Sequence, residues 1–137
     1  MNRISTLAVT IALLALAGCS TVGDIGRKVG LGATSPAGQK VDEGVSLYDQ
    51  GDFAGAIRTL QSPEVADGDV DTRVRASKYL AFSYCVTQRR ALCRRSFDAA
   101  LRLDDRFELK PAEAGHPIWG PVYAQARKAA DQRRDGR

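Results

Sequence analysis

The chain of 137 residues has one histidine, one tryptophan and three cysteines, and this scarcity limits the chemistry available to it. His116 has no second histidine with which to form a metal site, so we expect no metal and no cofactor. Motifs for nucleophilic hydrolysis (Gly-x-Ser-x-Gly) and for phosphate loops are also missing. Asp104, Asp105 and Glu108 lie close together in the sequence, but nothing around them indicates a pocket. We therefore expect a protein that is not an enzyme.

A large excess of charge of one sign is missing as well. The formal net charge is +4, and it falls to +3 once the first 18 residues, with Arg3, are left out. Such mild basicity does not favour nucleic acid as a partner. The strict alternation of apolar and polar residues that is typical of half-buried strands is missing from every segment. The folded part is therefore expected to be all-α.

The start of the chain has the pattern of an export signal. Residues 1–3 carry a positive charge, and residues 4–17 contain no charged side chain. This run is shorter than the ~20 apolar residues of a membrane span and fits the core of a signal peptide. The next step, Leu-Ala-Gly-Cys at 16–19, resembles the lipobox of bacterial lipoproteins. The resemblance implies a signal peptide over 1–18 and lipid on Cys19; an ordinary secretory signal with a chance cysteine is the alternative.

A tether is expected to follow the lipidated residue. Ser20 resembles the residue type that permits sorting of such lipoproteins to the outer membrane, with the domain facing the periplasm. Final anchoring in the inner membrane stays open as the alternative. Five glycines and little apolar pattern between residues 20 and 38 predict a flexible linker, so that the lipidated cysteine and linker together cover 19–38.

From residue 39 onwards, apolar residues recur at the three- and four-residue steps of amphipathic helices. We expect a helical domain over 39–130 and a frayed tail over 131–137. It contains two helical pairs, an irregular stretch over 104–117 and a last helix. The residues that mark the two pairs are Val41, Val45, Leu47, Tyr48, Phe53, Ala56, Ile57 and Leu60, and then Val74, Ser77, Leu80, Ala81, Tyr84, Cys85, Ala91, Leu92, Cys93, Phe97, Ala100, Leu101 and Leu103.

The two pairs align when the first is shifted by 37 residues. Gly44 then meets Ala81, and Leu60 meets Phe97, so small residues match small ones and large match large. Both pairs resemble tetratricopeptide repeats, whose usual period is about 34 residues. The resemblance implies two stacked helical hairpins; a generic bundle of helical hairpins is the alternative. The second pair departs from the pattern, because it lacks the glycine-aspartate turn that follows Gln50 in the first.

The last predicted helix is interpreted as a cap. Repeat units cannot bury their apolar faces alone, so the open end of the second pair needs a cover. Trp119 is expected in the core, with contact to a ligand as the alternative. The apolar stripe of this helix consists of Ile118, Trp119, Val122, Tyr123 and Ala126.

Cys85 and Cys93 remain once Cys19 is assigned to lipid. They lie on either side of a predicted turn over residues 87–90, at facing positions of one helical hairpin. An exported protein meets oxidising conditions, which favour pairing. We predict a disulfide between Cys85 and Cys93; two free buried thiols are the alternative. Their spacing is not the Cys-x-x-Cys of redox enzymes.

Four arginines surround the same turn: Arg89, Arg90, Arg94 and Arg95. They form either an electropositive surface for an acidic partner or lipid headgroups, or a solvated helix end.

A longer pattern resembles the TssQ family, small lipoproteins associated with type VI secretion systems. The resemblance covers roughly residues 39–128 in addition to the lipobox. It implies a periplasmic accessory lipoprotein of the secretion apparatus and brings no catalytic residues. The residues that carry it are Tyr84, Cys85, Cys93, Arg94, Phe97, Ala100, Phe107, Leu109, Pro111, Ala112, Glu113, Gly115, His116, Pro117, Trp119, Gly120, Pro121 and Val122.

Two functions from different classes follow from these patterns. The first is a lipid-tethered adaptor that holds a protein partner, which the sequence does not identify, within a type VI membrane complex. The second is a general cell-envelope assembly factor unrelated to secretion. An enzyme that uses the cysteine pair or His116 is the least favoured. The candidate groove residues of the adaptor, on the first helix of each pair, are Val45, Tyr48, Arg75, Lys78 and Phe82.

Overall fold

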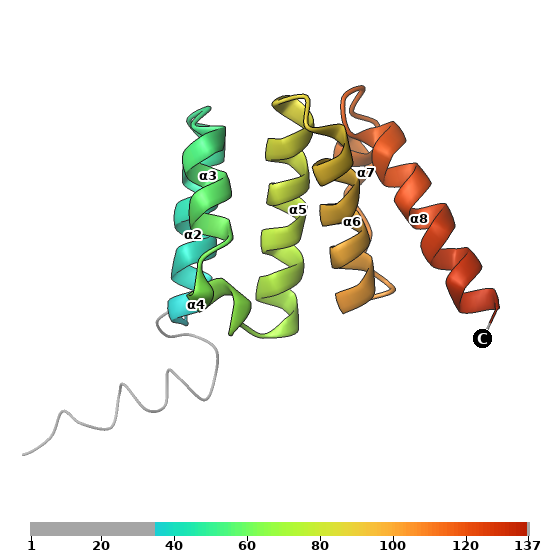
Figure 1. The fold of residues 1–137 in the computed structure, drawn as a ribbon, viewed down its shortest axis with the longest axis horizontal. Helices are drawn as coiled ribbons and strands as arrows, with labels where there is room; N and C mark the ends of the chain where they lie inside the picture. Colours follow the sequence, from blue (N-terminus) through green and yellow to red (C-terminus); the bar gives the residue numbers. More distant parts are fainter. Residues whose placement is uncertain (1–34, 137) are drawn as a thin grey trace, which may run out of the picture. The chain divides into compact units, whose positions relative to one another are not determined.

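The computed structural model describes residues 35–136, and in this part the fold is all-α, as predicted (Figure 1). The predicted signal peptide, Cys19 and most of the predicted linker lie outside the described residues. None of the described helices combines the length and the apolar character that crossing a bilayer would require. The helices are α2 (Pro36–Asp49), α3 (Phe53–Leu60), α4 (Pro63–Ala66), α5 (Val70–Val86), α6 (Arg90–Leu103), α7 (Pro111–Ala114) and α8 (Gly120–Asp135).

The first hairpin consists of α2 and α3. The hydroxyl of Ser35 accepts a hydrogen bond from the Gly38 amide and caps α2, and Pro36 suits the first helical turn because it needs no amide donor there. The prediction that the linker extends to residue 38 was therefore wrong by three residues. Gly51 forms the turn with a φ of 82°, and the Asp52 carboxylate caps α3 by accepting from the Gly55 amide at 2.8 Å.

The second hairpin consists of α5 and α6 and repeats the first with different turn chemistry. Its turn residue with positive φ is Gln88, at 62°, which lies 37 positions after Gly51. The next residue, Arg89, stands where Asp52 caps the first hairpin, and α6 has no side-chain cap. Side chains with a Cβ adopt this left-handed conformation at a cost of about 1–2 kcal/mol. The second turn is therefore intrinsically weaker than the first.

Burial follows the predicted 37-residue correspondence. Gly44 and Ala81 are both buried, as are Ala56 and Cys93 at equivalent positions of the second helices. The large partners Leu60 and Phe97 are 2% and 0% exposed. Small residues thus let the helices of each hairpin approach closely, while the large ones fill the space between them.

The close approach of α2 and α3 makes Gly44→Ala a sharp test of the packing. A Cβ at Gly44 would lie 2.6 Å from Cγ of Leu60, whose buried side chain has little room to move. Overpacking of this kind costs about 1–3 kcal/mol, and the better helix propensity of alanine returns at most about 1. We expect urea denaturation to show a net loss of about 1–2 kcal/mol. In a Leu60→Ala background the same substitution should no longer destabilise; a loss of equal size there would refute the steric explanation.

The C-terminal segment closes the end of the second hairpin. Helix α8 packs mainly on α6 and buries Val122 and Ala126. The Tyr123 hydroxyl donates to the Phe107 carbonyl at 3.2 Å and accepts from the Leu109 amide at 3.4 Å. These bonds hold the extended stretch before α7 against α8, and burial raises the pKa of the Tyr123 phenol. The Phe107 ring also packs edge-on against Tyr123 and Leu109 is buried, so both side chains have a structural role.

Several C-terminal predictions need correction or refinement. Trp119 is buried at 8% exposure, as predicted, but Ile118 is 46% exposed and does not belong to the apolar stripe. The stretch predicted to be irregular contains the short helix α7. The tail predicted to fray from residue 131 stays helical to Asp135, where ion pairs from Arg127 and Arg134 to Asp131 support the last turns.

Candidate interaction surfaces

Helix α5 lies between the first hairpin and α6 (Figure 1), and its sequence places different residues on its two opposite sides. At about 100° per residue, Arg75, Lys78 and Phe82 lie on one side. Ser77 and Leu80 lie on the other, about 180° away. The two surfaces of interest in the described part of the chain are built on these two sides.

The first surface is the α2–α5 face, which contains all five predicted groove residues. Val45 and Tyr48 of α2 are half-buried beside α5, and Arg75 forms an ion pair with Asp42 across the two helices. The Tyr48 ring packs edge-on against Tyr79, with centroids 5.4 Å apart. Burial raises the pKa of the phenols of Tyr48 and Tyr79. The sequence prediction thus brought together residues that share one face.

The C-terminal segment covers half of this face. Trp119 stacks on Phe82 with centroids 4.3 Å apart, and Phe82 is only 3% exposed. Lys78 forms a 2.7 Å ion pair with Glu113 of α7, and both side chains are largely buried. Phe82 and Lys78 were therefore wrongly predicted as open groove residues, because the chain folds back and occupies their side of α5.

His116 completes this cover. Its ring stacks on Trp119 at a centroid distance of 3.5 Å, and its Nδ1 accepts from the Ile118 amide at 3.2 Å. The Trp119 indole N–H donates to the Glu113 carbonyl at 2.8 Å. The histidine therefore organises the turn into α8. Within residues 35–136, no group of three His, Cys, Asp or Glu side chains is placed to hold a metal ion.

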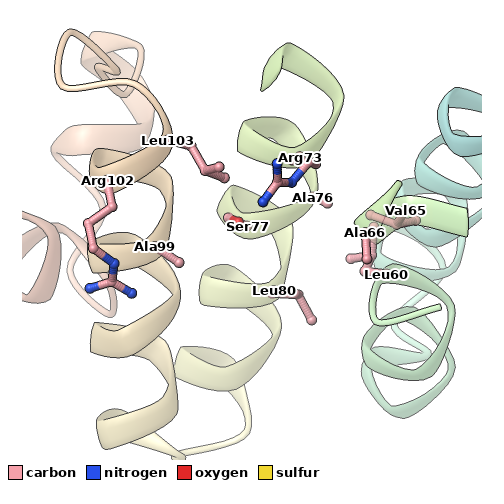
Figure 2. A pocket seen from close by; sticks show the side chains of 10 residues that line it. All are labelled: Leu60, Val65, Ala66, Arg73, Ala76, Ser77, Leu80, Ala99, Arg102 and Leu103. Carbon is pink, nitrogen blue, oxygen red and sulfur yellow. The ribbon is translucent and has the colours of Figure 1, made fainter. Parts of the chain in front are cut away.

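The second surface is an open groove on the opposite side of α5, which we call the α3–α6 groove. Figure 2 shows its side chains: Leu60, Val65 and Ala66 on the wall made by α3 and α4, Arg73, Ala76, Ser77 and Leu80 on α5, and Ala99, Arg102 and Leu103 on α6. It has a volume of about 360 Å³. The small side chains of Ala76, Ser77 and Ala99 leave the space above α5, between α3 and α6, unfilled.

The groove continues along α5 toward the turn of the second hairpin. This extension, of about 320 Å³, shares Ser77, Leu80, Ala99 and Arg102 with the first part and ends near Tyr84. From Arg73 to Tyr84 the floor covers about three helical turns. The groove is therefore long enough to contact several turns of an elongated ligand.

The rim of the α3–α6 groove is basic. Among residues 35–136, Arg73, Arg95 and Arg102 form no ion pair. The one acidic residue of the lining, Asp98, accepts from Nε of Arg94 at 3.1 Å, which balances its charge locally. The groove thus combines an apolar floor with uncompensated positive charge.

The predicted arginine cluster divides between several roles. Arg94 is paired with Asp98, the Arg89 guanidinium lies 5.9 Å from the Tyr84 ring centroid, and Arg95 lines the groove. Arg89 and Arg90 remain exposed at the turn, and Arg95 and Arg102 extend the positive charge along α6. The sequence signal for this extension was the spacing of Arg95 and Arg102, seven residues apart, with the small Ala99 between them.

The predicted pairing of Cys85 and Cys93 is confirmed at bonding distance. Their sulfur atoms are 2.11 Å apart and their Cα atoms 5.1 Å apart, across the turn that contains Gln88. Both cysteines are buried, so the bond belongs to the core of the second hairpin. It fixes the helix that carries Arg95 and Arg102 to α5.

Comparison of the chain with protein-family models, with curated proteins and with solved structures finds no match.

Proposed function

We propose that this protein is a lipid-tethered adaptor of the cell envelope that acts by binding a protein partner. The observation that supports this most directly is the α3–α6 groove, an open apolar surface with a basic rim on rigid helices. Surfaces built on packed helices hold their shape without a ligand, which lowers the cost of binding. The lipobox at residues 16–19 supplies the tether in this proposal.

The setting that we propose is the outer membrane, facing the periplasm, as an accessory lipoprotein of a type VI secretion system. The residues that resemble the TssQ family support this assignment. Several have structural roles in the described fold: Cys85 and Cys93 pair, and Trp119 covers Phe82. A general envelope assembly factor would have the same fold, so the setting needs its own test.

The tether is tested with Cys19→Ser in the full-length chain. The wild-type protein is expected to take up a labelled fatty acid in growing bacteria, whereas the variant takes up none because it lacks the acceptor thiol. Radiolabelling followed by gel electrophoresis measures this. Ser20→Ala is the matched control and should remain labelled. A wild-type chain without label would eliminate the anchor.

The setting is tested by deletion and complementation. Deleting the gene should reduce effector release by the type VI apparatus, and the wild-type chain should restore release while Cys19→Ser does not. Normal release together with an envelope defect in the deletion strain would favour the assembly factor. Genes for a secretion sheath and baseplate are expected nearby, and their absence would count against the secretion setting.

A further inference from the structure

We infer that the α3–α6 groove binds an amphipathic helix of the partner protein that carries carboxylates about two turns apart. This inference rests on the proposed adaptor function and specifies its binding surface and ligand. It places the partner on the side of α5 opposite the α2–α5 face.

The α3–α6 groove is open, whereas the C-terminal segment covers part of the α2–α5 face. On the α2–α5 face, Trp119 already stacks on Phe82, and Glu113 already forms an ion pair with Lys78. On the groove side, the residues about 180° around α5 face an open channel. A ligand there displaces water from an apolar floor and breaks no existing contact.

The arginines on the rim of the groove favour an acidic ligand. Arg95 and Arg102 are separated by seven residues of α6, which places them about 10 Å apart along the helix axis. A partner helix that runs along the groove would present carboxylates with the same separation when they are also seven residues apart. Each arginine can then bind a carboxylate through two N–H donors. Arg73 adds positive charge on α5.

The shape of the groove fits a helix. The floor is about three helical turns long and includes the small residues Ala76, Ser77 and Ala99. A channel of this kind accepts the side-chain stripe of a helix, which is the helix-in-groove mode of recognition. The lining is interrupted by polar groups of Gln61, Ser77 and Ser96, whereas an acyl chain would need an unbroken apolar lining. The groove therefore favours a peptide over a lipid.

Photocrosslinking in living bacteria tests the location. A benzoylphenylalanine in place of the exposed Ala66, on the wall of the groove, reports on the groove, and one in place of the exposed Arg75 reports on the α2–α5 face, both in the full-length chain. We expect a protein crosslink through position 66, and mass spectrometry of the crosslinked segment should show a helix-forming sequence with acidic residues seven apart. A lipid adduct, or a segment without acidic residues, would overturn the inference.

The same experiment separates two failures. Crosslinks through position 75 alone would leave the adaptor function standing and eliminate the groove. An absence of protein crosslinks at both positions would refute the adaptor function as well.

Titration of the crosslinked segment, as a synthetic peptide, tests the chemistry. Arg95→Glu with Arg102→Glu should weaken binding about tenfold or more, because the carboxylates would then face like charges. The matched control is Arg90→Glu with Lys128→Glu, which changes the net charge equally at exposed positions outside the groove and should leave the affinity nearly unchanged. Equal loss in both pairs would overturn the inference.

A neutral variant provides an independent check. Ala99→Leu fills the channel without a change in charge. It should weaken binding of the peptide as strongly as Arg95→Glu with Arg102→Glu does. Full retention of affinity in Ala99→Leu would show that the peptide binds elsewhere. Circular dichroism of each variant confirms that the helices are intact.

Discussion

Phe97→Ala is expected to lower the free energy of unfolding by about 3–5 kcal/mol, the largest effect of any single substitution considered. The Phe97 side chain is fully buried on α6 and joins two helices at once. Its ring packs edge-on against Phe82 of α5 at 6.1 Å and against Tyr123 of α8 at 5.4 Å. Truncation therefore leaves a cavity where the second hairpin meets its cap. A domain of about 100 residues has only about 5–15 kcal/mol of stability in total.

Urea denaturation measures this loss as a lower midpoint with an unchanged slope. Phe53→Ala is the matched control, because Phe53 is only half-buried and its one aromatic contact is with Tyr48. It should cost clearly less than Phe97→Ala. Equal losses for the two variants would show that the core is not centred on α6.

Removal of the disulfide is expected to cost about 2–3 kcal/mol, on the chain-entropy estimate for a loop of this length. We expect the Cys85→Ala, Cys93→Ala double variant to melt at a lower temperature than the oxidised wild type. Reduced wild-type protein should approach the double variant. Unchanged melting in the double variant would contradict the stabilising role.

The weak turn of the second hairpin suggests a rescue of this variant. Gln88→Gly removes the energetic cost of a positive φ at this position. Arg89→Asp gives α6 the cap that Asp52 gives α3 in the first hairpin. Together these changes should restore about 1–2 kcal/mol. The same pair of substitutions at exposed Gln125 and Lys128 is the control; glycine inside α8 costs about 0.5–1 kcal/mol, so this pair should lower stability further instead of restoring it. Failure of the rescue would show that the disulfide does more than hold the turn.

The repeat pattern of the fold could be predicted from local signals. Helix spacing and the shift of 37 residues located both hairpins, because core positions such as Gly44 and Phe97 differ clearly in size from their neighbours. The start of α2 was missed because Gly38 looked like linker, although Ser35 and Pro36 are a recognisable helix start.

The candidate site was harder to predict. Periodicity assigns a residue to a face of its helix, but it does not say which distant segment will cover that face. Phe82 and Lys78 were correctly placed together on one side of α5, yet Trp119 and Glu113 return from more than thirty residues away to cover them. The α3–α6 groove depends on small residues of α5 and α6 and on the position of α3 and α4 across from α6, and no local pattern marks such an opening.

The two-sided character of α5 has a consequence for mutational tolerance. From Arg73 to Tyr84, most positions serve a helix neighbour, the groove or the C-terminal cover. Few substitutions in this stretch are therefore expected to be neutral in a library of random variants. The outward face of α8, with Gln125 and Lys128, is exposed and should tolerate substitution better. Affinity tags and fluorescent reporters therefore belong on α8, and α5 is the helix in which folding and recognition constrain the same residues.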